Sequence, residues 1–301
     1  MALNNPAFNS PAFQDPKTTG GRRVGLTPPA AQTQYATAQH AGTDAAAQAH
    51  LEGMYSAPAA GAIETDRMSV EDTVWKTAGL FAVLLVTAVA GWVWTMSSVT
   101  AINPSPNMAP WLIGALGGFV LAMVIIFTSR KKVRPALIFG YAAFEGLFVG
   151  AISAFFEFLY PGIVVQATLA TFSVVGVTLA LFASGKIRAS KKATKIFLIA
   201  MVGYLVFSLL NIVLMWTGVA DGAFGMLSET FMGIPLGLII GVLVVIMAAY
   251  SLVLDFDQIQ QGVRNGAPRQ FGWLGAFGIM VTVVWLYVEI LRIIAIVRGS
   301  N

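Results

Sequence analysis

The sequence predicts an all-α integral membrane protein built from seven transmembrane helices. Its composition is typical of membrane proteins, because 57% of the 301 residues are hydrophobic and only 11% are charged. The mean hydropathy of +0.75 agrees with this interpretation. Seven apolar segments follow one another along the chain, and the loops between them alternate in charge. These observations exclude an ordinary soluble domain.

The chain begins with a polar stretch, residues 1–66, which is rich in Ala, Gln, Thr, Gly, Pro and Asn and has no sustained apolar period. This composition predicts a disordered tail over residues 1–70, followed by a seven-helix transmembrane domain over residues 71–301. Phe8 and Phe13 each follow Pro-Ala, so the alternative is a short peptide that docks a protein partner. The tail has no apolar signal-peptide core, so the first helix is expected to direct insertion itself.

The apolar segments have the length of transmembrane helices, since most of them reach the roughly 20 residues that span a bilayer. They run over residues 77–99, 111–129, 136–158, 163–183, 196–216, 231–254 and 272–297. In the sixth segment, the spacing of Gly233, Gly237 and Gly241 predicts a small-residue face where helices approach closely.

The loops alternate between cation-free and cationic. Loops 97–110, 160–162 and 217–230 contain no Lys or Arg. The cations lie in the other loops and before the first helix, namely Arg67, Lys76, Arg130, Lys131, Lys132, Arg134, Lys186, Arg188, Lys191, Lys192, Lys195, Arg264 and Arg269. By the positive-inside rule, we expect a cytoplasmic N-terminus and, after seven crossings, a C-terminus outside. Arg298 alone lies on the opposite side of this scheme.

The residue inventory argues against an enzyme. The only histidines are His40 and His50, both in the tail, and the chain has no cysteine. A rhomboid-like serine protease therefore lacks its membrane-embedded His, and a zinc protease lacks its HExxH pair. The final helix has no lysine for a retinal Schiff base, and neither a P-loop nor GxGxxG is present. We expect no catalytic activity and no cofactor, and the net charge of +4 reflects topology rather than nucleic-acid binding.

Carboxylates inside the apolar segments are the candidate functional residues, because acids in the hydrocarbon are costly. Glu145 lies about 15 Å into the third segment, near the middle of the bilayer. Asp255 and Asp257 close the sixth segment. Glu289 lies within the seventh, with Arg292 three residues later on the same helical face. The structural alternatives are a neutral, hydrogen-bonded glutamate, solvated helix-end aspartates and a stabilising Glu–Arg ion pair.

Three segments together carry a family resemblance. The sixth apolar segment ends in Leu254-Asp255-Phe256-Asp257-Gln258-Ile259. The seventh contains Trp285-Leu286-Tyr287-Val288-Glu289-Ile290-Leu291, and the third begins with Arg134-Pro135, followed by Phe139-Gly140-Tyr141-Ala142-Ala143-Phe144-Glu145-Gly146. In this order the segments resemble the Bax inhibitor-1 family, namely its helix-six aspartate motif, its helix-seven Leu-Tyr-x-Asp motif and its early core helix. The likeness covers residues 77–301.

The resemblance implies six helices around a central C-terminal seventh. Bacterial relatives in that family are described as pH-sensitive calcium leak channels, in which two carboxylates share a proton and gate the pore while a basic residue latches them. By position, the resemblance makes Asp255 and Glu289 the sensing acids and calcium ligands, Glu145 an auxiliary acid, Asp257 a secondary acid, and Arg134 or Arg292 the candidate latch. Two acids at close range cannot both carry charge at low cost, and calcium prefers several oxygen ligands.

The spacing of the two acids leaves their pairing open. If the last helix begins at Phe271, Glu289 lies about 27 Å along it, far from Asp255 at the end of the preceding helix. A direct pair would need a later helix start, near Phe277, or a loop that folds inward. By depth alone, Glu289 would pair with Glu145.

The sequence thus predicts a pH-regulated cation leak channel of a bacterial plasma membrane, with calcium as the permeant ion. The first alternative is a non-conducting, stress-protective membrane protein that regulates other membrane proteins, with residues 1–66 as a contact. The second is a proton-coupled transporter of a small solute.

Overall fold

The computed structural model describes residues 66–100, 104–129, 132–220 and 224–299, and most of them are helical. The long helices are α2 (Val70–Met96), α3 (Ala109–Thr128), α4 (Pro135–Leu159), α5 (Ile163–Ala183), α6 (Lys191–Trp216), α7 (Leu236–Arg264) and α8 (Gly272–Gly299). The short elements are the 3-10 turns η3 (Gly225–Ser228) and η4 (Arg269–Phe271) and the antiparallel hairpin of β1 (Thr230–Phe231) and β2 (Ile234–Pro235). The predicted disordered tail lies outside the described residues.

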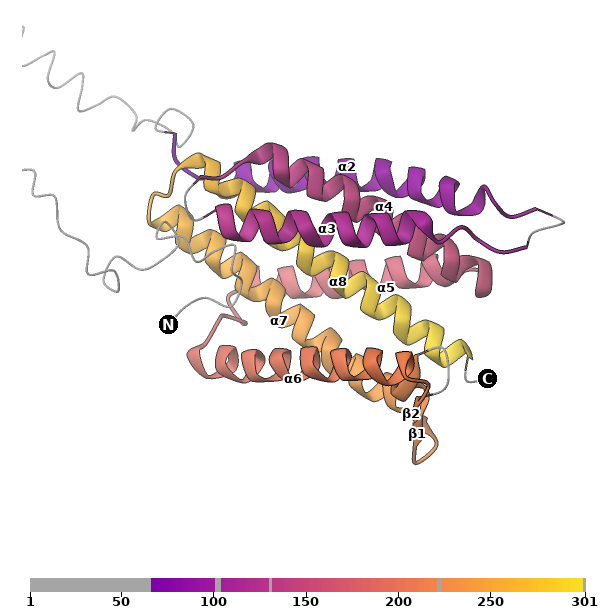
Figure 1. The fold of residues 1–301 in the computed structure, drawn as a ribbon. Coiled ribbons are helices and arrows are strands. Elements are labelled where there is room, and N and C mark those ends of the chain that lie inside the picture. Colours follow the sequence, from indigo (N-terminus) through magenta and orange to yellow (C-terminus); the bar gives the residue numbers. More distant parts are fainter. Residues whose placement is uncertain (1–65, 101–103, 130–131, 221–223, 300–301) are drawn as a thin grey trace, which may run out of the picture.

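Seven helices of the described chain are long and apolar enough to cross a membrane, which confirms the predicted fold class. The central element is α8, which packs against α2, α4, α5 and α7. Half of its most apolar window is buried inside the protein, a larger share than in any other described span. Figure 1 shows α8 running obliquely across the molecule. Helix α3 packs mainly on α4, so it belongs to the outer wall.

Glycines bring α2 and α4 into close contact. A Cβ atom on Gly150 would collide with the backbone carbonyl of Ala88, and one on Gly146 would collide with the carbonyl of Leu84. The two helices therefore pack backbone against backbone, as small residues permit in membrane bundles. The pair forms one wall of the bundle, against which α8 lies (Figure 1).

The segment before α2 is fastened to the link between α7 and α8. The N–H of Met68 donates to the carbonyl of Ala267 at 2.7 Å, and the N–H of Arg269 donates to the carbonyl of Asp66 at 2.9 Å. The guanidinium of Arg269 also donates twice to Asp72 Oδ1, at 3.0 and 2.8 Å. Within the described part of the chain, contacts with the bundle are therefore already present at Asp66, before the domain boundary predicted at residue 70.

Serine caps explain why two helices begin earlier than predicted. Helix α2 begins at Val70 and α6 at Lys191, whereas the apolar pattern placed them at about 77 and 196. The side chains of Ser69 and Ser190 each accept a hydrogen bond from a backbone N–H three residues later, at 3.1 and 3.2 Å. These caps satisfy N–H groups of the first turn and allow the helices to start in polar sequence.

Helix α7 begins later than the segment predicted from residue 231. The hairpin of β1 and β2 precedes it, and Gly233 occupies the hairpin turn with a left-handed φ of +80°. Of the three spaced glycines, only Gly237 and Gly241 therefore lie in the helix. The predicted small-residue face is shortened accordingly.

Helix α7 also ends later than predicted, at Arg264 instead of Leu254. The added turns are polar in sequence, but they pack against the bundle and bury Gln258, Ile259 and Gly262. The placement of Asp255 at a helix end was wrong, since this residue lies inside α7 and is 1% exposed. The polar residues after Leu254 predict a loop, but in the structure they stay helical because this part of α7 packs against the rest of the bundle.

Helix α6 is peripheral, as Figure 1 shows, and only Phe197 and Asn211 of it are buried. It is held near its ends by polar contacts. Near its start, Thr194 Oγ1 lies 2.9 Å from the hydroxyl of Tyr250 on α7. Near its end, Asn211 donates to the carbonyl of Phe224 at 3.1 Å and so ties α6 to the segment before η3. The exposed apolar residues of α6 are suited to lipid.

Candidate functional site

Two buried carboxylates lie on the contact between α7 and α8, which we call the α7–α8 seam. The first is Asp255 on α7, whose Oδ2 accepts a hydrogen bond from Thr282 Oγ1 on α8 at 2.6 Å. Ser251 Oγ, one turn earlier on α7, lies 3.4 Å from the same hydroxyl. We call Ser251, Asp255, Gln258 and Thr282 the Asp255 cluster. It places an acid among neutral oxygen groups.

Gln258 is the member of this cluster whose polar atoms are not satisfied. It lies three residues after Asp255, on the same side of α7, and is 1% exposed. Neither its Nε2 nor its Oε1 has a hydrogen-bond partner. A buried amide without partners costs free energy, so such a residue calls for an explanation. The amide oxygen is available to a water molecule or a cation.

The second carboxylate is Glu289 on α8, which is 3% exposed. It forms an ion pair with Arg292 on its own helix. The hydroxyl of Tyr204 on α6 donates to Glu289 Oε2 at 3.3 Å and accepts from Arg292 Nη1 at 2.8 Å. We call Tyr204, Glu289 and Arg292 the Glu289 cluster. Gly241 of α7 closes it on one side, because a Cβ atom there would lie 3.5 Å from Glu289 Oε1.

The two clusters are neighbours on one face of α8 without touching through their acids. Thr282 and Glu289 are seven residues apart on α8, which corresponds to two turns and about 10 Å along the axis. Helix α8 begins at Gly272, close to the predicted start at Phe271. Asp255 therefore lies opposite Thr282, and the structure does not bring Asp255 and Glu289 together as a hydrogen-bonded pair.

The other predicted acids lie away from this contact pair. Glu145 lies one turn after Tyr141 on α4 and faces α3, where a Cβ atom on Gly118 would lie 2.9 Å from its Oε2. It is therefore not beside Glu289, although the depth of both residues suggested that pairing. Asp257 is half-buried and accepts a hydrogen bond from Gln261 Nε2 at 2.7 Å.

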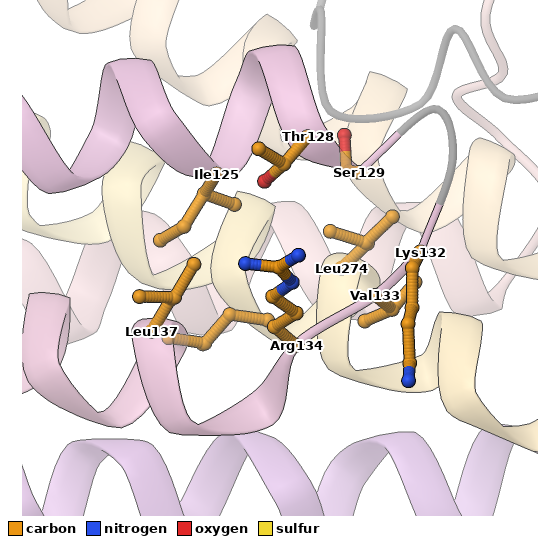
Figure 2. Close-up of a pocket in the computed structure, with 9 residues that line it drawn as sticks. Ile125, Thr128, Ser129, Lys132, Val133, Arg134, Leu137 and Leu274 are labelled. Atoms are coloured by element: carbon orange, nitrogen blue, oxygen red, sulfur yellow. The ribbon is translucent and has the colours of Figure 1, made fainter.

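The two candidate latches occupy different places. Arg292 contacts Glu289 directly. Arg134 lies in a pocket at the end of α3, next to Leu274 of α8, as Figure 2 shows. Leu274 precedes Thr282 by eight residues, or about 12 Å along α8. The structure thus places Arg134 in this pocket and not beside the Asp255 cluster.

Charges at the opposite end of the bundle have structural roles. Both oxygens of Glu157 accept backbone N–H groups at the start of α5, from Gly162 at 2.6 Å and Val164 at 3.1 Å. Arg298 donates to the carbonyl of Pro161 at 2.9 Å and to Gln166 Oε1 at 2.9 Å. These bonds to the α4–α5 turn explain why an arginine is found on the cation-poor side.

The described part of the chain contains no group of three His, Asp or Glu side chains that could hold a metal ion. Asp255 and Glu289 belong to separate clusters, so they are not joint ligands of one site in this structure. Calcium binding by these acids stays a prediction. The oxygen atoms that lie together are the carboxylate of Asp255 and the hydroxyls of Ser251 and Thr282.

Sequence reasoning did not identify Thr282, Ser251, Gln258 and Tyr204 as members of these clusters. Two of them had a signal in the sequence. Thr282 precedes Glu289 by seven residues and so shares its face, and Gln258 follows Asp255 by three. Tyr204 had none, because α6 is apolar on all sides and its pattern does not indicate which side faces the bundle.

The fold and these clusters define a class: a multi-pass helical membrane protein with acids buried beside a central C-terminal helix. The sequence model of a family described as Bax inhibitor 1 like matches residues 5–299. The chain therefore belongs to the Bax inhibitor 1 like family. No curated protein and no solved structure matches it. The family match begins within the polar tail, whereas the motifs in the sequence carried the resemblance only over residues 77–301.

Proposed function

We propose that this protein is a pH-regulated cation leak channel, with calcium as the permeant ion, in the plasma membrane of a bacterium. It acts without enzymatic chemistry, and its N-terminus lies in the cytoplasm. The observation that supports this most is the α7–α8 seam, where two carboxylates are buried inside membrane-spanning helices. Buried intramembrane acids are costly and are mostly found at ion or proton pathways.

The two clusters would respond differently to a proton. The hydroxyl of Thr282 donates to the Asp255 carboxylate, and it could accept from a carboxylic acid equally well, since a hydroxyl is both donor and acceptor. Asp255 can therefore take up a proton and keep its partner. Protonation of Glu289 would instead remove the ionic partner of Arg292, whose Nε is already buried without a hydrogen bond.

This difference suggests how pH regulates the seam. Loss of the Glu289 charge leaves a partly buried arginine without its ionic partner, which favours an arrangement of α6, α7 and α8 in which Arg292 finds other partners. The Asp255 cluster would then supply oxygen atoms to the passing cation. Calcium suits this cluster because it binds the oxygen atoms of carboxylates, amides and water in a flexible geometry.

Calcium flux into proteoliposomes tests this proposal. Flux would be measured from mildly acidic to mildly alkaline pH for the wild type, Asp255→Asn, Glu289→Gln and the double variant. Glu157→Gln is the control, because that acid caps a turn at the far end of α4. We expect the pH dependence of the flux to be lost in Glu289→Gln and in the double variant, the size of the flux to fall in Asp255→Asn, and both to be kept in the control. An unchanged pH profile in all three seam variants would rule the mechanism out.

One observation favours the alternative of a non-conducting partner protein. The family match extends to residue 5, so much of the polar tail belongs to the family pattern. If the tail binds a membrane partner, that partner should co-purify with the full chain and be lost when residues 1–65 are deleted. Absence of flux at every pH together with such a loss would favour this function over the channel.

A further inference from the structure

A pocket with a cationic rim opens at the end of the bundle where α3 ends and α4 begins. It is a shallow pocket, and the empty space of about 170 Å³ around its lining residues includes the open surroundings. Its walls include Ile125, Thr128, Lys132, Arg134, Leu137 and Leu274. Figure 2 shows the guanidinium of Arg134 within the pocket, between these apolar side chains and Thr128. We call it the Arg134 pocket.

The two cations of the pocket have side chains without partners in the described chain, unlike Arg269 and Arg188 at the same end of the protein. Arg269 is paired with Asp72, and Arg188 donates to Gln260. Among the described residues, the side chains of Lys132 and Arg134 have neither a hydrogen bond nor an ion pair, although their backbones are hydrogen-bonded. The hydroxyls of Thr128 and Ser129 donate to carbonyls of their own helix. Neither hydroxyl is hydrogen-bonded to the guanidinium of Arg134 in the described structure.

The backbone around the pocket adds to its preference for an anion. Helix α4 begins at Pro135, and its N-cap residue Arg134 makes no side-chain hydrogen bond to the first turn. Pro135 has no N–H and the N–H of Leu137 donates to the carbonyl of Arg134, so the backbone contributes mainly the positive end of the helix dipole at this place. The pocket, two cationic side chains and the start of α4 therefore lie at the same place, which favours an anion there.

The location of the pocket indicates the source of the anion. It lies between the ends of two membrane-spanning helices, at the level where lipid headgroups meet water. Val124 and Phe127, in the last turns of α3, are exposed and apolar, so acyl chains are expected beside them. Apolar walls below a cationic rim match a lipid whose phosphate is charged and whose glycerol region is not.

We propose that the Arg134 pocket binds the phosphate of an anionic phospholipid. The fork of the Arg134 guanidinium takes two phosphate oxygens, and Lys132 adds a point charge at the rim. Leu274, which forms one wall and is fully buried, belongs to the central helix α8. A bound lipid therefore lies over the central helix, separated from it by the walls of the pocket.

Native mass spectrometry of the full chain in detergent tests this proposal. Short-chain phosphatidylglycerol would be titrated against phosphatidylcholine, with Arg134→Gln, Arg134→Lys, Lys132→Gln and Arg264→Gln as variants. Arg264→Gln is the matched control, because it removes the same charge from an exposed site at the end of α7. Unfolding temperatures without added lipid show whether each variant is folded.

We expect the wild type to bind phosphatidylglycerol and not phosphatidylcholine at the same concentration. Arg134→Gln should weaken this binding by about tenfold or more, since charge-assisted hydrogen bonds are lost, and Arg134→Lys by less. Lys132→Gln should weaken it more than Arg264→Gln, and this comparison stands even if Arg134→Gln does not fold. Equal losses in Lys132→Gln and Arg264→Gln would overturn the pocket, and competition by inorganic phosphate as effective as by lipid would overturn the lipid source.

Discussion

The Asp255 and Glu289 clusters both stabilise a buried carboxylate, but with partners of different kinds. Each buries a carboxylate on the α7–α8 seam, but Asp255 has a hydroxyl as its partner and Glu289 has an arginine. The hydroxyl can satisfy both protonation states of its acid, whereas the arginine satisfies only the charged state. The partner of a buried acid, more than its depth, therefore decides how protonation of that acid affects the packing of the surrounding helices.

The largest expected effect comes from breaking the ion pair. Glu289→Gln leaves the partly buried Arg292 uncompensated, so the free energy of unfolding should fall by up to about 3–5 kcal/mol, the loss found for broken buried pairs. Unfolding by a denaturing detergent in mixed micelles measures this quantity for wild type and variant under identical conditions.

A double-mutant cycle separates the pair from its surroundings. Arg292→Met and the variant with both substitutions complete the cycle, and the double variant should be more stable than Glu289→Gln alone, because no unpaired charge is left. A loss below about 1 kcal/mol in Glu289→Gln would mean that water reaches the arginine and that the pair is not functionally buried.

The second effect comes from removing the neutral partner. Thr282→Val keeps the shape of the side chain but removes the hydroxyl that donates to Asp255. Because a buried acceptor then loses this partner, we expect a loss of about 1–3 kcal/mol in the free energy of unfolding. The same micelle titration measures it.

Thr171→Val is the matched control for this variant. Thr171 is also buried, but its hydroxyl bonds the carbonyl of Ala167 in its own helix. The control should therefore change stability much less than Thr282→Val. Equal losses in both variants would show that Thr282 stabilises α8 only as a buried threonine and not through Asp255.

The fold was predictable because each span carries its own signal. Length, apolar content and loop charge act locally, so seven helices could be identified without knowledge of their packing. Errors occurred where tertiary contacts prevail over local composition. Polar turns of α7 after Leu254 are helical because Gln258 and Ile259 are buried, and the start at Leu236 depends on a hairpin.

The site was predictable only in part, for a related reason. Acids in or next to apolar sequence are visible in one dimension, so Asp255 and Glu289 could be singled out as candidates, although Asp255 was placed at a helix end. Their partners are set by how helices cross. Tyr204 reaches Glu289 from α6, and Thr282 faces Asp255 from α8, neither of which follows from the pattern of one helix. The pairing of acid with acid was therefore the least predictable feature.

A third, smaller effect is expected at the contact of α6 with the Glu289 cluster. Tyr204→Phe removes one hydroxyl that bonds both Glu289 and Arg292 while the ring stays in place. The free energy of unfolding should fall by about 1 kcal/mol, the usual contribution of one hydrogen bond. The effect should shrink when Tyr204→Phe is made in a Glu289→Gln background, because the two residues share one network. Full additivity would indicate that the tyrosine stabilises α6 independently of the acid.

The smallest expected effect on stability belongs to Gln258, and it bears on function. Both amide atoms are buried without partners, so Gln258→Met replaces an unsatisfied group by an apolar one of similar length. Such replacements are nearly neutral or stabilising, and we expect a change within about 1 kcal/mol or a gain. If the amide oxygen serves a permeating cation, calcium flux should fall in this variant while stability does not. A loss above about 2 kcal/mol would instead mean that the amide has a structural partner such as a buried water, and Gln258 would then belong to the scaffold of the seam.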